Sequence, residues 1–155
     1  MATPTYIKLA EVTASSGNTL IEFSSLPTTY RDLVLVGNYF NSSGGVVSAR
    51  WNGATTSQRR IRMFARDGNS PYTDQAADAN IGEYAAGDLR NQIVVHWMDY
   101  RATDKYKVAI VRHAGLNRAF MYANHWESTS AVTSVGLTFN RGLVAGSTFA
   151  LYGIE

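Results

Sequence analysis

Apolar and polar side chains alternate in short runs along most of the chain, and this period of two predicts β-strands. The clearest run is Asp32 to Phe40, where apolar residues fall on both faces, as in a central strand. Clusters of Gly, Asn, Ser and Pro separate the runs and predict turns. The other expected strands are Tyr6 to Thr13, Thr19 to Phe23, Val46 to Trp51, Arg59 to Ala65, Gln92 to Tyr100, Tyr106 to His113, Ala119 to Trp126, Ala131 to Phe139 and Thr148 to Ile154.

No stretch of the chain keeps the 3.6-residue apolar period of a helix for three turns, so we expect an all-β protein. Eight to ten short strands at regular spacing predict a single antiparallel β-sandwich over residues 1–155. A jelly-roll-like arrangement is favoured, with a closed barrel as the alternative. The most apolar alternating runs place the expected core at Leu33, Val34, Leu35, Val36, Val95, Trp97, Val108, Ile110, Val135, Leu137 and Leu151.

The segment from Asp67 to Arg90 breaks the alternation, because it is rich in Gly, Ala, Asp and Asn. We expect one long loop near residues 67–90, with at most one short strand near Ile81 to Tyr84. A loop of this length in a compact domain usually has a function. We predict that it contacts a neighbouring subunit, with Tyr72 and Tyr84 as aromatic anchors. A short Gly-Ser linker in place of residues 74–82 is then expected to leave the isolated domain folded.

Composition narrows the class of protein further. The chain has 155 residues, which is the size of one domain, and no cysteine, which excludes disulfides and thiolate chemistry. The formal net charge of +2 is too small for a nucleic-acid-binding surface. No apolar run reaches the roughly 18 residues of a membrane span. The first residues lack the features of a signal peptide, so we expect synthesis in a cytoplasm and no membrane partner.

The basic residues are mostly arginine, with 11 Arg among the 14 Lys and Arg. The densest cluster is Arg59, Arg60, Arg62 and Arg66. Such a cluster is typical of a solvated face or of a protein interface, where Arg and aromatic residues are enriched and Lys is depleted. Nucleic-acid binding is the third alternative. Because the cluster leads directly into the long loop, we predict one interface patch made of Arg59, Arg60, Arg62, Arg66, Tyr72, Asp74 and Tyr84.

The sequence contains no motif that indicates catalysis, a cofactor or a metal. The three histidines lack the His-x-His spacing of a metal-binding jelly roll, so we expect separate structural roles for them. Glycoside hydrolysis requires two carboxylates at a set separation. The carboxylates that the fold might bring together are Glu83, Asp88, Asp99, Asp104 and Glu127. No nucleophile elbow, P-loop or dinucleotide fingerprint is present, so we expect no enzyme.

Several segments resemble one group of proteins. They are Thr5 to Thr13, Ile21 to Leu35, Arg50 to Gly53, Ala131 to Val135 and Gly146 to Ile154. Together they are similar to the small virion structural proteins of tailed phages that are common in aquatic phages. The similarity extends from Thr5 to Ile154, is densest at both ends and is weak from Asp67 to Arg90.

The resemblance implies a virion component without catalytic activity or cofactor. The resemblance leaves open which component of the virion this is. The length of the chain, its low net charge, its excess of arginine over lysine and its long loop favour a capsid decoration (cement) protein. We expect such a protein to lie on the outer surface of the head, bound to the major capsid protein and assembled as a homotrimer. The alternative is a tail or head fibre module that grips host-surface glycans through Trp and Tyr side chains. An exposed plane of aromatic rings would favour the fibre module, whereas burial of Trp51, Trp97 and Trp126 would count against it.

Overall fold

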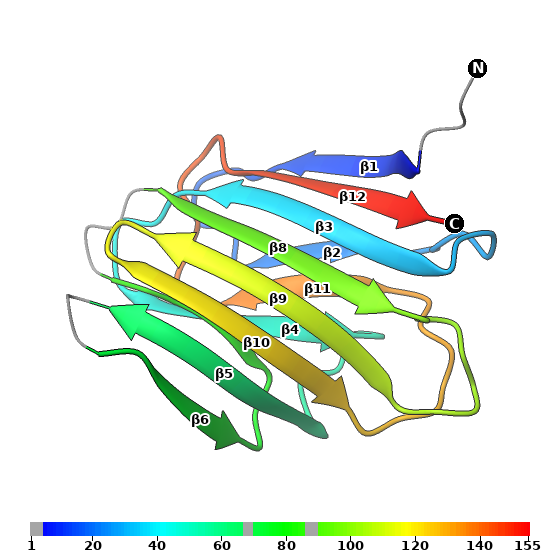
Figure 1. Ribbon diagram of the computed structural model, residues 1–155. Helices are drawn as coiled ribbons and strands as arrows, with labels where there is room; N and C mark the ends of the chain where they lie inside the picture. The colour runs from blue at the N-terminus through cyan, green and yellow to red at the C-terminus, as the bar shows by residue number, and fades with distance from the viewer. Residues whose placement is uncertain (1–4, 67–69, 86–89) are drawn as a thin grey trace.

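The computed structural model describes residues 5–66, 70–85 and 90–155, apart from the side chain of Arg66. The described residues form twelve strands in two antiparallel sheets and contain no helix. The two sheets pack face to face, with the large sheet in front and the small sheet behind it in Figure 1. The all-β, antiparallel sandwich expected from the alternation is therefore confirmed. No described segment is a helix that could cross a membrane.

The large sheet has eight strands and the small sheet has four. In spatial order, the large sheet consists of β1 (Tyr6–Thr13), β12 (Thr148–Ile154), β3 (Asp32–Tyr39), β8 (Asn91–Met98), β9 (Lys107–Gly115), β10 (Arg118–Trp126), β5 (Gln58–Arg66) and β6 (Tyr72–Ala76). The small sheet consists of β2 (Leu20–Phe23), β11 (Val135–Phe139), β4 (Gly45–Trp51) and β7 (Asn80–Tyr84).

The strand pairing is nested. Strand β1 pairs with β12, β2 with β11, β3 with β8 and β4 with β7. The first four strands therefore pair in order with later strands taken in reverse, as in a long ribbon folded back on itself. The remaining strands, β9, β10, β5 and β6, continue the large sheet beyond β8, as the lower left of Figure 1 shows.

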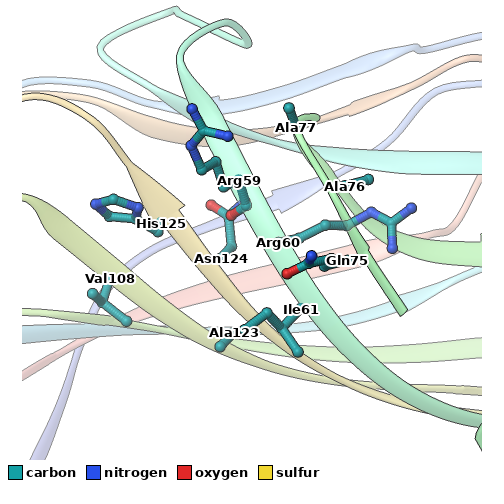
Figure 2. Close-up of a pocket in the computed structure, with 10 residues that line it drawn as sticks. All are labelled: Arg59, Arg60, Ile61, Gln75, Ala76, Ala77, Val108, Ala123, Asn124 and His125. Carbon is teal, nitrogen blue, oxygen red and sulfur yellow. The ribbon is translucent and has the colours of Figure 1, made fainter. Parts of the chain in front are cut away.

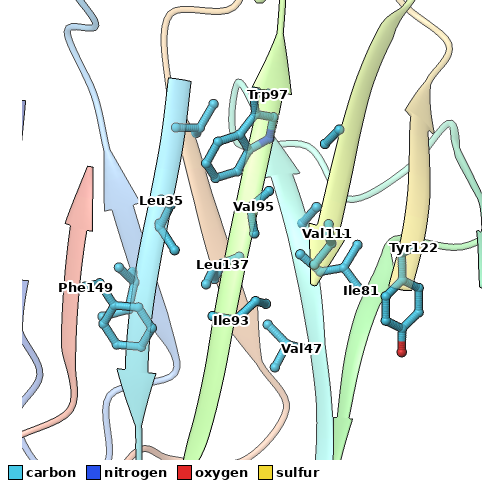
Figure 3. Close-up of a cluster of buried hydrophobic side chains, with 14 of the residues drawn as sticks. Leu35, Val47, Ile81, Ile93, Val95, Trp97, Val111, Tyr122, Leu137 and Phe149 are labelled. Atoms are coloured by element: carbon cyan, nitrogen blue, oxygen red, sulfur yellow. The ribbon is translucent and has the colours of Figure 1, made fainter. Parts of the chain in front are cut away.

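The core lies between the two sheets and is rich in aromatic rings. Trp51 of β4 stacks on Trp126 and meets Trp97 edge to face, with ring centroids 5.9 and 6.3 Å apart. Aliphatic side chains of both sheets fill the rest, as Figure 3 shows. The expected core residues that are buried between the sheets are Leu33, Leu35, Val95, Trp97, Val135, Leu137 and Leu151. Val34 is buried as well, but it lies on the opposite face of β3, outside this core cluster.

The core assignment was wrong for Val36, Val108 and Ile110. Val36 and Ile110 are exposed and Val108 is half-buried. In β9 the core face instead carries Lys107, Ala109, Val111 and His113. Both faces of this strand carry apolar residues, so alternation alone does not indicate which face points inward. Ala109 is fully buried on the inner face, whereas Val108 and Ile110 lie on the outer face of β9.

The expected strand number was also too low. The short strand expected near Ile81 to Tyr84 is present as β7, but the segment taken as a long loop also contains β6. Strand β6 is an edge strand that pairs only with β5, so it needs few apolar residues and gives no apolar alternation. In β7, Gly82 interrupts the pattern, since an added Cβ would lie 3.2 Å from the His113 ring. From β6 to β7 the chain crosses from the edge of the large sheet to the edge of the small sheet.

Candidate functional site

The described arginine side chains of β5 lie on both faces of the strand, with Arg59 outward and Arg60 and Arg62 inward. Arg60 and Arg62 point toward the interior, where their side chains are only 8% and 11% exposed. Arg60 donates hydrogen bonds from Nε to Asp78 Oδ1 at 2.7 Å and from Nη1 to Asp74 Oδ1 at 2.9 Å. The prediction of a solvent-exposed face is therefore wrong for these two arginines.

Arg62 completes this cluster. Its Nη2 donates to Asp74 Oδ2 at 2.6 Å, its Nη1 donates to Glu83, and its guanidinium lies 4.2 Å from the centre of the Phe64 ring. Hydrogen bonds from Arg62, opposed by partial burial and reinforced by Arg60, hold the pKa of Asp74 below its usual value. We call Arg60, Arg62, Asp74, Asp78 and Glu83 the arginine clamp. The arginine clamp fastens β6 and β7 to β5, which is a structural role.

The other members of the predicted interface patch are scattered. Arg59 is exposed and bonded to Glu127, with Nε to Oε1 at 2.5 Å. Tyr72 is 45% exposed and its ring contacts Phe64. Tyr84 is 2% exposed and packs edge to face against Tyr39 in the core. The prediction that Tyr84 anchors a contact with another subunit is therefore wrong. The side chain of Arg66 lies outside the described residues.

A different surface, which sequence reasoning missed, lies on the outer side of the large sheet. Its side chains come from neighbouring strands: Ile61 lies opposite Ala123, which in turn lies opposite Ile110, and Met63 lies opposite Met121. Ile61, Met63 and Met121 are 59%, 51% and 47% exposed. We call this surface the outer apolar face, and its members are Val36, Ile61, Met63, Val94, Val108, Ile110, Met121 and Ala123.

The outer apolar face is not flat. A groove of about 540 Å³ is lined by residues of β5, β6, β9 and β10. Figure 2 shows Arg59 and His125 toward one end of the groove and Ile61 beside Ala123 at the other. The groove continues into a shallower hollow of about 220 Å³ that shares Ile61 and Ala123 and is bordered by the two methionines and Ile110. No carboxylate among the described residues lines either hollow. The lining of the larger groove combines the apolar Ile61, Val108 and Ala123 with the polar Arg59, Gln75 and His125.

The three histidines have separate roles, as expected. His96 Nε2 lies 2.9 Å from Asp32 Oδ2, and the ring of His125 contacts Tyr106. His113 is buried beside Tyr39, with 2.6 Å between its Nε2 and the tyrosine hydroxyl. Burial, and then the nearby Arg118, lower the pKa of His113 to about 4. The described residues hold no cluster of ligands that fits a metal ion.

Lowering the pH from about 6.5 to about 4 is expected to lower the free energy of unfolding by up to about 3 kcal/mol through His113. In this range the unfolded chain binds a proton at His113 and the folded chain does not, so stability is lost as the pH falls. Urea unfolding across the range, followed by circular dichroism, measures the effect. His113→Gln should lose most of this pH dependence, and the partly exposed control His125→Gln should keep it. Equal slopes for the wild type and His113→Gln would contradict the assignment.

The candidate carboxylates are mostly paired with cations. Asp99 accepts hydrogen bonds from Lys105 Nζ at 2.6 Å and Arg31 Nε at 3.0 Å, which lower its pKa. Arg59 likewise lowers the pKa of Glu127. Proton donation at neutral pH requires a raised pKa instead. Asp88 lies outside the described residues, Glu83 belongs to the arginine clamp, and Asp104 is exposed.

Aromatic side chains form no evident sugar-binding plane on the described surface. Trp51 and Trp97 are fully buried and Trp126 is 7% exposed. The exposed Tyr6 and Tyr72 lie on β1 and β6, at opposite edges of the large sheet, and the exposed Tyr106 lies just before β9. In comparisons of this chain with protein-family models, with curated proteins and with solved structures, no match was found.

Proposed function

We propose that this chain is a virion structural protein of a tailed phage, and specifically a capsid decoration protein. It binds the major capsid protein on the outer surface of the head and stabilises the head. The observation that carries the proposal is the outer apolar face, on which Ile61, Met63 and Met121 are about half exposed. Soluble monomers rarely expose a contiguous apolar patch of more than a few hundred Å², and a larger patch marks a protein contact. The resemblance of the segment from Thr5 to Ile154 to phage virion proteins supports a phage virion as the assembly that this surface contacts.

The nested strand pairing also supports this proposal. We infer a jelly roll in which β1-β12-β3-β8 forms one four-stranded sheet and β2-β11-β4-β7 forms the other. The pair β5 and β6 is inserted between β4 and β7, and the pair β9 and β10 is inserted between β8 and β11. Viral capsid domains, lectins and cupins use this architecture, so it is compatible with a virion protein without identifying one.

The alternative functions have less support. A fibre module that grips glycans needs exposed aromatic rings, and the three tryptophans are buried. A glycosidase needs a pair of carboxylates facing a groove, and the groove of the outer apolar face has none among the described residues. The buried, ion-paired arginine clamp gives no support to nucleic-acid binding through Arg60 and Arg62.

Purified protein is expected to bind expanded heads of its phage that lack this protein, and to raise the temperature at which the heads break open. The physical reason is that a ligand of the assembled lattice stabilises the assembled state by mass action. Cosedimentation with the heads measures binding, and the release of packaged DNA on heating measures stability. Heads that already carry the protein are the control and should bind no more of it. Failure to bind the deficient heads would contradict the proposed function.

A further inference from the structure

Three polar side chains with unused N–H groups border the larger groove. They are Arg59 of β5, Gln75 of β6 and His125 of β10. Glu127 accepts a hydrogen bond from Nε of Arg59, and within the described chain nothing accepts one from its two terminal nitrogens. Those two nitrogens form a planar fork that matches the two oxygens of a carboxylate. Because no described carboxylate lines the groove, the fork is suited to a carboxylate that a partner brings.

The shallower hollow lies further along the same strands and is apolar. Ile61 belongs to both hollows, and Met63 and Met121 line only the shallower one. These three side chains are about half exposed. Methionine adapts its shape to an apolar group of irregular outline. The hollow is therefore suited to an aliphatic side chain.

The spacing of the two features fits an extended chain. Arg59, Ile61 and Met63 follow one another on the outer side of β5, at intervals of about 6.6 Å. Side chains i and i+2 of an extended segment have the same interval and point to the same side. A segment lying along β5 therefore places an acidic side chain beside Arg59 and, two residues on, an apolar side chain at the hollow.

The area of this site also favours a segment over a folded surface. The groove and the hollow lie on four strands, β5, β6, β9 and β10. With about 4.8 Å between strands and about 3.3 Å per residue, four strands over five residues cover roughly 300 Å² in plan. A standard interface between folded partners buries about 800 Å² on each side. Extended peptides, by contrast, bind through a few side-chain pockets and specific polar contacts.

We propose that the groove and the hollow bind an extended segment of the major capsid protein in which an acidic residue is followed, two positions on, by an apolar residue. The inference deepens the proposed function and rests on it for the identity of the partner. The carboxylate of the segment accepts hydrogen bonds from the terminal nitrogens of Arg59, and the apolar side chain enters the hollow between Met63 and Met121. The charged contact gives specificity, and burial of the apolar side chain adds affinity.

A synthetic peptide tests the site without any capsid. The probe is acetyl-Thr-Ser-Glu-Thr-Leu-Thr-Ser-amide, and NMR chemical shifts of the backbone amides of the full chain report binding. At up to about 5 mM, which is enough to detect a Kd of about 1 mM, the probe should shift the amides from Arg59 to Met63. Peptides with Lys in place of Glu, or Ser in place of Leu, should shift them much less. No shift with the probe, equal shifts with all three peptides, or larger shifts with glucuronate would overturn the inference.

Two variants separate the charged contact from the apolar one. Arg59→Gln should weaken binding of the probe by about tenfold, because it removes the fork. Met63→Lys should also weaken it, because the new side chain occupies the apolar hollow. A purely electrostatic contact would instead be strengthened by the added positive charge. Binding to Met63→Lys that equals or exceeds binding to the wild type would therefore overturn the role of the hollow.

Each variant has a matched control elsewhere on the surface. Arg31→Gln removes another exposed arginine whose Nε bonds a carboxylate, that of Asp99. Leu20→Lys adds a charge at a side chain that is 42% exposed on β2 of the small sheet. Both controls should bind the probe as the wild type does, and all four variants should keep the wild-type circular dichroism spectrum.

Cosedimentation of the same variants with deficient heads separates the inference from the proposed function. Arg59→Gln and Met63→Lys should bind the heads less tightly than their controls do. Heads that bind the wild type and both site variants equally would overturn the inference and leave the proposed function standing. A wild type that binds the probe and fails to bind the heads would instead count against the proposed function alone.

Discussion

Replacing Trp51 with alanine is expected to lower the free energy of unfolding by about 3–5 kcal/mol. Trp51 is fully buried between the sheets and contacts the rings of Trp97 and Trp126. Its Nε1 donates to Asn124 Oδ1 at 3.1 Å, and Asn124 is itself fully buried. The substitution leaves a cavity and removes the indole donor from a buried amide, and both effects are destabilising.

Urea unfolding followed by circular dichroism measures this loss. Trp51→Phe is the matched variant, because it keeps an aromatic ring and removes the indole donor; its cost should be smaller than that of alanine. Tyr106→Ala, which truncates a 54% exposed ring, should change stability little. A loss below about 1 kcal/mol for Trp51→Ala would contradict the central place of this ring in the core.

Replacing Asp74 to Gly82 with a short Gly-Ser linker is expected to unfold the domain or to destabilise it by several kcal/mol. The replacement removes the fully buried Ile81, whose loss alone costs about 2–5 kcal/mol. It also removes Asp74 and Asp78, which leaves the guanidinium of Arg60 buried without its partners. Breaking a buried ion pair by removing one partner costs about 3–5 kcal/mol. The structure thus reverses the expectation that this segment is dispensable.

The same unfolding measurement tests the replacement, with melting temperature as a second readout. The double substitution Thr73→Ser and Gln75→Ser is the control, because both positions lie in β6 but outside the arginine clamp. It should stay close to wild-type stability. A linker variant that unfolds cooperatively at the wild-type urea concentration would show that β6, β7 and the arginine clamp contribute little to stability.

The sequence by itself determined the fold class and the location of most strands. In β3, the run of apolar residues on both faces predicted a central strand, and β3 lies between β12 and β8. The prediction succeeds because alternation is a local property: successive side chains of a strand point to opposite faces whatever the strand pairs with. Turn residues act equally locally. The Asn52-Gly53 pair that follows β4 forms a tight turn, in which both residues have positive φ angles, of 49° and 78°.

Only the tertiary structure decided which partner each strand and each charge has. Arg60 meets Asp78, 18 residues away, because β6 and β7 return beside β5, and no spacing rule in the sequence predicts that return. Both faces of β9 carry apolar residues, and Ile110 is exposed because the small sheet covers the other face. The outer apolar face arises in the same way, from strands that add to the large sheet beyond β8 while the small sheet stops at four. Pairing and coverage are properties of distant segments, and local periodicity carries no information about them.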